Sequence, residues 1–338
     1  MVTKPIYIIG PYPPLVGGVS THIERILPLT RKRGMDVHVM AVNKDHRADD
    51  FVEFIPTWQL PIRLLLMPSS IVHLHVDAWY FLLLCRLLGW RHGFMLTVHH
   101  NRYPTQFLSG SFVSQIKKWS LRSFWRIVCV NEETLHYLKS MGCHVYPKEV
   151  PAFLPPVDID FESVNDIKDW AAHFDYVLSG YAYRLSFYKD EDLYGIDMMI
   201  ELMDELIHRK GKSVGLALVL SMDESPYLSE IKSRILTKGL SSHVKLIDIN
   251  GGIDANALWS ISSVYLRPTN TDGDSISVRE ALYVGTTVVA SNCVKRPEGC
   301  LLFTNRDQAS LNQVVLEAIT QSRNPVTTKD SVNLEYYE

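Results

Sequence analysis

Cysteine is scarce in this chain of 338 residues and follows no pattern. The five cysteines are odd in number, and no pair has the Cys-x-x-Cys spacing. A disulfide framework of the kind that stabilises small secreted proteins is therefore not expected. The distribution instead predicts reduced thiols in a cytoplasmic protein.

Long hydrophobic runs are also missing. The most apolar stretch, residues 62–90, is interrupted by Pro68, Asp77 and Arg86. It therefore never provides the roughly 18 apolar residues that a membrane-spanning helix needs. Near the N-terminus the apolar run "IYII" is only four residues long, which does not fit a secretory signal peptide. We expect neither a transmembrane segment nor a leader.

A strong excess of one charge is absent as well, because 34 Lys and Arg face 37 Asp and Glu. This balance shows no nucleic-acid signature. The charge is unevenly spread, however: residues 1–158 carry 17 basic and 11 acidic side chains, and the remainder carries 17 and 26. A basic half and an acidic half predict two domains with different partners, and the length also suits two domains.

Short apolar runs alternate with helix-length segments along the whole chain. Such alternation predicts parallel, doubly wound sheets. The proline-rich stretch 150–162 is the expected linker. We expect domains over residues 1–157 and 158–324, with a tail, 325–338, that can return to the first domain. The predicted strands cover residues 4–10, 36–42, 71–76, 94–100, 126–130, 175–180, 214–221, 243–248, 263–268 and 287–291.

An acidic loop, "TDGDSISVREAL" at residues 271–282, stands between one of these strands and a predicted helix. Ser275 or Ser277 is the expected N-cap. Free amides at a helix start favour a phosphate, whereas carboxylates such as Asp272 and Glu280 accept hydrogen bonds from ribose and sugar hydroxyls. Ligands of doubly wound sheets bind at the carboxyl ends of the strands. The loop therefore predicts a nucleotide-sugar site.

These residues resemble the retaining glycosyltransferases of family 4, which have the GT-B fold of two Rossmann-like domains facing a cleft. The family has an acid, seven residues, Glu, then Ala-Leu or Ala-Met, a Gly and a strand. The chain reads Asp272, Glu280-Ala281-Leu282, Gly285 and "VVAS". "GPYPPLVGGVSTHIERI" and "TVHH" resemble the family's first loop and its Thr-x-His. The bacterial surface-polysaccharide branch is the most similar.

The resemblance implies roles for individual residues. Asp272 would hold donor-sugar hydroxyls, Glu280 the ribose, and His99 the sugar near its reacting carbon, so His99 and Asp272 are the catalytic candidates. No metal and no cofactor are implied. The implied donor-binding residues are Gly17, Gly18, Arg184, Lys189, Gly273, Asp274, Ser275, Ile276, Ser277 and Glu280.

The chain departs from the family at two points. Asp272 stands where Glu is usual, so its side chain is one methylene shorter. The family's Arg and Lys-Gly pair, which holds the diphosphate, is not plain, because Tyr194 precedes Gly195 where Lys is expected. Arg184 is our first candidate for the diphosphate clamp, and Lys189 is the second.

Histidines and a basic helix remain to be explained. His73 and His75 alternate on one strand and so share a face. Together with Asp77 they could suggest a metal site, but no third ligand of matching spacing follows, so no metal site is expected.

Residues 110–128 mix aromatic with basic side chains and predict a helix that lies on an anionic membrane; the alternative is a solvated basic face. The expected acceptor or membrane contacts are His22, Lys117, Lys118, Trp119 and Arg122.

The predicted function is retaining transfer of a hexosyl or N-acetylhexosaminyl group from a UDP- or GDP-sugar. The acceptor would be a glycan or a polyprenyl-linked lipid in polysaccharide biosynthesis, such as that of O-antigen or capsule. The protein would lie on the inner face of the plasma membrane. Two alternatives stay open: a nucleotide-sugar 2-epimerase of the same fold, and a non-catalytic nucleotide-sugar-binding assembly protein.

Overall fold

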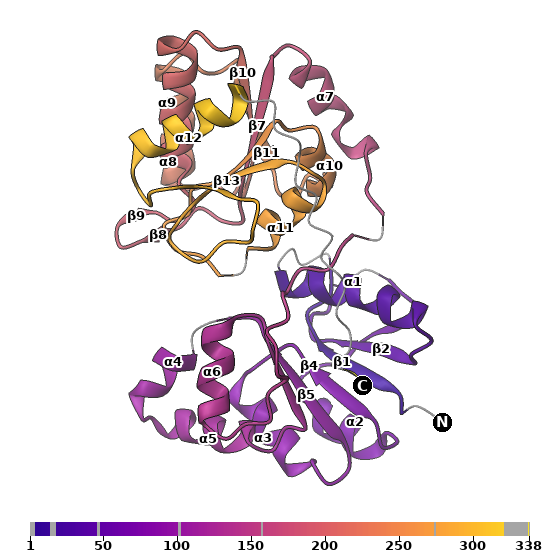
Figure 1. Cartoon of the computed structure of the whole chain (residues 1–338). Helices are drawn as coiled ribbons and strands as arrows, with labels where there is room; N and C mark the ends of the chain where they lie inside the picture. Colours follow the sequence, from indigo (N-terminus) through magenta and orange to yellow (C-terminus); the bar gives the residue numbers. More distant parts are fainter. Residues whose placement is uncertain are drawn as a thin grey trace. The chain divides into compact units, whose positions relative to one another are not determined.

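The computed structural model describes residues 4–13, 18–45, 48–100, 103–156, 158–273, 275–320 and 337. These residues divide into two compact units. The N-terminal unit comprises the described residues up to 156 together with Tyr337, and the C-terminal unit comprises residues 158–320 (Figure 1). Each unit is built around one six-stranded parallel sheet. The predicted doubly wound α/β class is thereby confirmed.

The sheet of the N-terminal unit has the strand order β3-β2-β1-β4-β5-β6. Its strands are β1 (Ile6–Gly10), β2 (Val37–Ala41), β3 (Val52–Phe54), β4 (Ile71–Leu74), β5 (Gly93–Val98) and β6 (Arg126–Cys129). The helical segments of this unit are α1 (Gly18–Lys32), α2 (Leu60–Leu66), α3 (Trp79–Leu87), α4 (Tyr103–Gln106), η1 (Phe107–Ser109), α5 (Phe112–Leu121) and α6 (Glu132–Ser140).

Helices cover both faces of this sheet. The apolar sides of α2, α3, α5 and α6 share one core cluster, which includes Leu64, Leu82 and Leu121. Helix α1 packs on the opposite face, where Ile23 and Ile26 meet Ile8 of β1. Because both faces are covered, the strands read as continuous apolar runs and not as alternating ones. Helices α2, α3, α5 and α6 thus lie on one side of the sheet, and α1 lies on the other.

The sheet of the C-terminal unit has the strand order β11-β10-β7-β12-β13-β14. Its strands are β7 (Tyr176–Ala182), β10 (Val214–Leu220), β11 (Val244–Asp248), β12 (Val264–Arg267), β13 (Thr287–Ser291) and β14 (Leu301–Phe303). A two-stranded antiparallel hairpin, β8 (Phe187–Tyr188) and β9 (Glu191–Asp192), stands beside it. The helical segments are η2 (Glu162–Val164), α7 (Asn165–Ala171), α8 (Ile196–Asp204), η3 (Glu205–Arg209), α9 (Pro226–Thr237), α10 (Ala255–Ser260), α11 (Ile276–Tyr283) and α12 (Gln308–Thr320).

Two cores sandwich this sheet. Leu216 and Leu218 of β10 face the cluster under α8, α9 and α12. Val219 and Ala217, which alternate with them, face the cluster under α7, α10 and α11. This alternation follows from the period of two in a strand. The packing anchors α11 at its buried face, which includes Val278, so the loop before it is held against the end of the sheet.

The ten predicted strands correspond to ten of the twelve strands in the two large sheets, and the linker region 150–162 contains none of these strands. The sequence patterns do not predict the edge strands β3 and β14, because three residues are too few to show a periodicity. All five cysteines are free. Among the described residues, no helix is long and apolar enough to cross a membrane.

Candidate functional site

The acidic loop lies where three parallel strands end. Strand β12 pairs with β7 on one side and β13 on the other, with Arg267 beside Ala290. Parallel strands place their carboxyl ends at one edge of a sheet. That edge therefore brings together the loop after Arg267, the start of α11 and the segment that follows Ser291. The sequence predicts the first two of these at a carboxyl edge but not the third.

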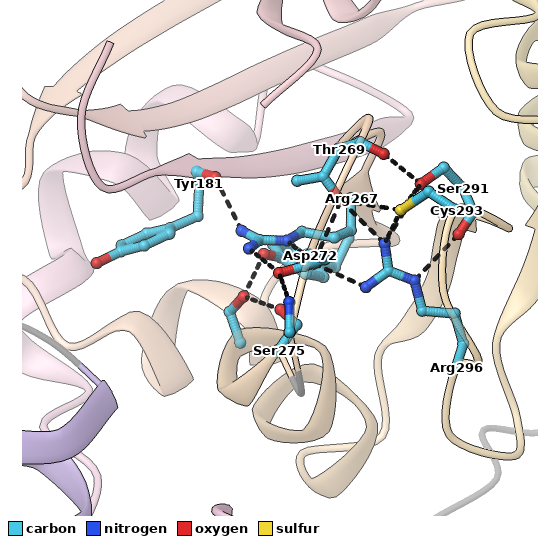
Figure 2. A network of polar contacts seen from close by, with 11 residues as sticks. Tyr181, Arg267, Thr269, Asp272, Ser275, Ser291, Cys293 and Arg296 are labelled. Carbon is cyan, nitrogen blue, oxygen red and sulfur yellow. Dashed lines mark hydrogen bonds and ion pairs between the residues drawn. The ribbon is translucent and has the colours of Figure 1, made fainter. Parts of the chain in front are cut away.

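Asp272 is the centre of a polar network at this edge (Figure 2). The guanidinium of Arg267 binds it through two atoms, with Nε 3.0 Å from Oδ2 and Nη2 3.1 Å from Oδ1. Arg296 donates from Nη1 to Oδ2 at 2.7 Å. Thr269 Oγ1 and the Gly273 amide also donate to the carboxylate, at 3.2 and 3.0 Å. Such bidentate, charge-assisted bonds are the strong class of hydrogen bond.

The electrostatics of Asp272 follow from this arrangement. Burial acts to raise the pKa of its carboxyl, but the guanidinium groups of Arg267 and Arg296 outweigh burial and lower the pKa to about 2. The side chain of Arg296 is itself only 2% exposed. The three side chains therefore form a buried ionic cluster in which one carboxylate balances two cations, leaving a net positive charge at the carboxyl ends of the strands.

This geometry does not support direct binding of donor-sugar hydroxyls by Asp272. Five protein donors already fill the hydrogen-bonding positions of the carboxylate, which has about four lone-pair sites. A sugar hydroxyl could bind only by displacing one of them. Asp272 is thus a positioning residue for Arg267 and Arg296, neither of which the sequence patterns identify. The only sequence signal for Arg267 is a basic residue at the end of an otherwise apolar strand, "SVYLRP".

The start of α11 has some of the features expected of an anion-binding site. Ser275 occupies the N-cap position, as predicted, but its side chain makes no capping hydrogen bond. Its Oγ instead lies 3.2 Å from Oγ of Ser277, which also bonds the hydroxyl of Tyr265 at 2.7 Å. Ile276 is the first helical residue, and Gly273 is exposed. The first amides of α11 are consequently not capped by the Ser275 side chain.

Glu280 lies on the buried face of α11, as the fifth residue of the helix. The cations proposed for the diphosphate lie elsewhere in the same unit: Arg184 is exposed after β7, and Lys189 is exposed in the β8–β9 turn with a φ of 52°. Tyr194, which stands at the expected lysine position, lies beneath Arg267, whose Cζ is 5.3 Å from the ring centroid. Arg267 thus places a cation beside the position where the family has lysine.

In the N-terminal unit the structure gathers four histidines. His99 follows β5, and its Nε2 lies 2.9 Å from Nδ1 of His75. His22 on α1 donates from Nδ1 to the carbonyl of Ala152 at 2.6 Å. His73 bonds the hydroxyls of Tyr337 and Thr97, each at 2.7 Å. The sequence does not predict this cluster, because its members come from three separate elements.

Burial keeps these imidazoles neutral. It lowers the pKa of His22 to about 4 and that of His73 to about 3, with neighbouring cationic or imidazole groups acting in the same direction. The pKa values of His75 and His99 are also lowered well below the usual range, first by burial and then by the adjacent histidines. A neutral His99 agrees with a role as a hydrogen-bonding group near a developing positive charge.

The predicted basic helix is present, but one of its cations is not on the surface. Lys117 is buried, and its Nζ lies 3.4 Å from Asp77, which also binds His100 at 2.9 Å. The prediction that Lys117 contacts a membrane is therefore wrong. Trp119 and Arg122 are exposed and Lys118 is half-buried. Gly18 begins α1 and is exposed, whereas the predicted donor-site residues Gly17 and Asp274 lie outside the described residues.

The sequence model described as Glycosyltransferase Family 4 matches residues 16–161, slightly less than half of the chain. No curated protein sequence matches significantly. Several solved structures share the fold. HepE from Anabaena, solved with UDP and glucose, has a TM-score of 0.68 at 14% identity, covering 95% of this chain and 92% of that one.

Two further structures are similar. A glycosyltransferase from Rickettsia africae has a TM-score of 0.67 at 12% identity, covering 99% of this chain and 92% of its own. WaaG, a glycosyltransferase involved in lipopolysaccharide biosynthesis, has a TM-score of 0.59 at 14% identity, covering 95% and 92%. These neighbours confirm the predicted GT-B architecture of two Rossmann-like domains.

Replacing Asp272 by Asn should destabilise the C-terminal unit. The change leaves two buried guanidinium groups without their countercharge, and removing one partner of a buried ion pair costs about 3–5 kcal/mol. The pKa of Asp272 is lower in the folded protein than the value of about 3.9 in the unfolded chain. The stability that this difference contributes is complete above about pH 3.9 and is lost as the pH falls toward the folded pKa. The advantage of the wild type over Asp272→Asn should therefore narrow below about pH 4.

Urea unfolding of both proteins between pH 7 and pH 3 measures this difference. Asp36→Asn is the control, because Asp36 forms an exposed pair with His38 and the change should alter stability by less than about 1 kcal/mol. A loss for Asp272→Asn no larger than that of the control would show that the cluster does not stabilise the unit.

Proposed function

We propose that the chain is a glycosyltransferase of family 4 that transfers a sugar, with retention of configuration, from a nucleoside-diphosphate sugar to a glycan or lipid-linked acceptor. The match of residues 16–161 to the family model and the GT-B fold support this proposal. The observation that carries the donor assignment is the edge of the C-terminal sheet. There the net positive Arg267–Asp272–Arg296 cluster lies at the carboxyl ends of β12 and β13, and α11, which contains the buried Glu280, begins beside it.

The diphosphate gains negative charge as the sugar leaves it. We propose that Arg184, Lys189 and the first amides of α11 neutralise that charge, and that no metal ion takes part. Donors fixed before the reaction need no reorganisation as charge develops, which is why such groups accelerate the step. Asp272 contributes by holding Arg267 over Tyr194, so Arg267 supplies the cation that the family's lysine would supply.

The remaining roles follow from charge and position. Glu280 accepts hydrogen bonds from the ribose hydroxyls. His99, held by His75 and kept neutral by burial, hydrogen-bonds the donor sugar near its reacting carbon, where a cation would oppose the developing positive charge. UDP is our first choice of carrier, because HepE was solved with UDP-glucose. Polysaccharide biosynthesis, of O-antigen or capsule type, is the proposed setting, supported by the likeness to WaaG.

Glu280→Ala should weaken nucleotide binding by about 10- to 150-fold, because the charged hydrogen bonds it removes are worth roughly 1.5–3 kcal/mol. Binding is measured by calorimetry with a panel of UDP- and GDP-sugars. Glu298→Ala is the matched control, since Glu298 is exposed. Circular dichroism establishes that the variant is folded. Equal affinity in the two variants would remove Glu280 from the donor site.

The same panel separates the three candidate functions. A transferase releases free nucleotide only when a membrane-lipid or glycan acceptor is present, and its activity survives EDTA. A 2-epimerase isomerises the donor sugar without any acceptor. A binding protein does neither, although its melting temperature rises with the correct nucleotide sugar. Isomerised donor in the absence of acceptor would replace the transferase proposal with the epimerase.

His99→Ala should lower turnover by about 100-fold or more while nucleotide affinity stays nearly unchanged, because the contact strengthens only in the transition state. The product linkage, determined from NMR coupling constants, should be α when the donor is α. His136→Ala, a change on an exposed face of α6, is the control. A β-linked product would contradict retention, and full turnover by His99→Ala would move the catalytic contact to another residue.

We also propose that the N-terminal unit binds an anionic membrane surface. Helices α2, α3 and α5 and their adjoining loops expose many large apolar side chains, and large exposed apolar patches mark protein or membrane interaction sites. Leu66 and Trp90 are 75% and 74% exposed. The exposed set in these elements is Trp58, Ile62, Leu65, Leu66, Trp79, Tyr80, Leu87, Trp90, Leu108, Phe112, Val113, Trp119 and Trp125.

Arginines link these helices through hydrogen bonds and supply positive charge, which is attracted to anionic lipid. Arg86 of α3 lies 3.6 Å from the ring centroid of Trp119 and donates to its carbonyl at 2.9 Å. Arg91 donates to the carbonyl of Met67, at the end of α2, at 2.7 Å. Tryptophans beside basic residues are typical anchors at the lipid headgroup level. A lipid-linked acceptor would be presented at that surface, on the inner face of the plasma membrane.

The double change Lys118→Glu and Arg122→Glu should weaken binding to phosphatidylglycerol vesicles by about 30-fold or more, since each cation near such a surface contributes about 1 kcal/mol. Co-sedimentation at rising salt measures it, and binding by the wild type should fall as salt increases. Arg209→Glu with Lys210→Glu in the C-terminal unit, where both side chains are exposed, is the control. Binding that ignores salt and lipid charge would contradict the proposal.

A further inference from the structure

Three histidines from distant parts of the sequence converge in the N-terminal unit. His75 and His99 follow the adjacent strands β4 and β5, whose register pairs His73 with Met95. His22 comes from α1, which follows the neighbouring strand β1. One possible ligand nitrogen from each of the three rings lies within 4.8 Å of the others. The ring centroids are 5.1 to 5.2 Å apart in all three pairs.

The hydrogen bonds leave nitrogens of this cluster without a partner. Nδ1 of His22 donates to the Ala152 carbonyl, so its Nε2 carries a lone pair. Within the described part of the chain, Nε2 of His22 and Nε2 of His75 are buried and have no hydrogen-bond partner. A buried polar atom left unpaired costs about 1–3 kcal/mol. Two such atoms in one cluster point to a ligand that the protein itself does not provide.

The chemistry of the cluster selects the ligand. Neutral imidazole nitrogens suit divalent transition metals, and three histidines with one open position are a common zinc-binding set. A histidine ligand usually donates its other ring N–H to a carbonyl or carboxylate, as His22 does to Ala152. His99 is only half-buried, which leaves access from solvent.

His73 is excluded as a ligand although it shares a strand with His75. Both of its nitrogens are used, by Tyr337 and Thr97. The sequence spacing therefore suggests the wrong pair, His73 with His75, and Asp77 does not complete it because it pairs with His100 and Lys117. The other two ligands are His22 on α1 and His99 after β5, and only folding brings them to His75.

We propose that His22, His75 and His99 bind one divalent transition-metal ion of the Zn²⁺ class, and that the bound ion inhibits sugar transfer by occupying His99. The zinc-to-nitrogen distance is about 2.0–2.1 Å, so the rings, whose nitrogens lie within 4.8 Å of one another, must turn toward the ion to close the site. The binding of the ion does not depend on the proposed function. The inhibition does rest on the proposed function, because it assumes that His99 contacts the donor sugar.

The test of binding uses the whole metal-free chain and Co²⁺, whose visible absorption is strong in a four-coordinate site and weak in water. One equivalent of Co²⁺ should produce that absorption, and Zn²⁺ should displace it. His22→Asn keeps an amide at the Nδ1 position, able to bond Ala152, but removes Nε2. It should weaken Zn²⁺ binding by about 100-fold or more, since losing even a ligand's hydrogen-bond partner costs about 10- to 100-fold.

His75→Gln is the second variant, and it should lose binding to the same extent. His92→Asn is the matched control, because His92 is buried but bonds Ser70 and Leu64; it should bind Co²⁺ like the wild type. Circular dichroism establishes folding of all three. The site would be overturned if the wild type gave no four-coordinate Co²⁺ spectrum. It would also be overturned if both cluster variants gave the same spectrum as the wild type.

Activity separates the two proposals. Zn²⁺ at the concentration that saturates the site should reduce transfer at least about tenfold, and a chelator should restore it. If Co²⁺ binds as described but no nucleotide sugar is consumed under any condition, the transferase proposal fails and the metal site stands. If transfer is observed and Zn²⁺ fills the site without slowing it, the inhibitory role is wrong.

Discussion

All strands of each large sheet run in the same direction, and the placement of the polar side chains depends on this constraint. A parallel sheet with helices on both faces buries the middle of its strands, so a polar residue there needs a partner within the protein, as His73 and Thr97 provide for each other. Ligand-binding groups therefore gather where the strands end. At one such edge the C-terminal unit places Arg267 and Asp272. At the corresponding edge of the N-terminal unit lie His75 and His99. Both clusters follow from connecting apolar strands in parallel.

The two clusters differ in charge: the one in the C-terminal unit is ionic, and the one in the N-terminal unit is neutral. In the C-terminal unit charged groups are buried together, and each guanidinium is tolerable because Asp272 shares its charge; the pair of arginines leaves the edge net positive, which suits a diphosphate. In the N-terminal unit burial without countercharges keeps His22 and His99 neutral. Neutral rings suit a sugar carbon that develops positive charge, and the same neutrality suits a transition metal. Under the proposed function, the diphosphate is bound by the C-terminal unit and the reacting sugar carbon is contacted by the N-terminal unit.

Much of the architecture can be read from residue patterns. Continuous apolar runs separated by helix-length segments predict the ten central strands, because burial on both faces imposes that pattern whatever the tertiary details. The loop of Asp272 and Glu280 is recognisable because its spacing is local. The role of Asp272 is not, because its partner Arg296 lies after the next strand and nothing in the spacing connects them. Lys117 shows the same limit: a basic residue on an amphipathic helix reads as exposed, but here Asp77 and packing bury it.

Local order along the chain thus decided the element types, the sheet class and the loop in which Asp272, Ser275 and Glu280 stand, since each depends on neighbours within a few residues. Folding alone decided which side chains meet. It brought Arg296 onto Asp272, which also pairs with Arg267. It also brought His22 and His99 to His75, although spacing had suggested no third ligand. Contacts of that kind join residues 24 to 53 positions apart, and the periodicity of a strand or helix carries no information over such separations.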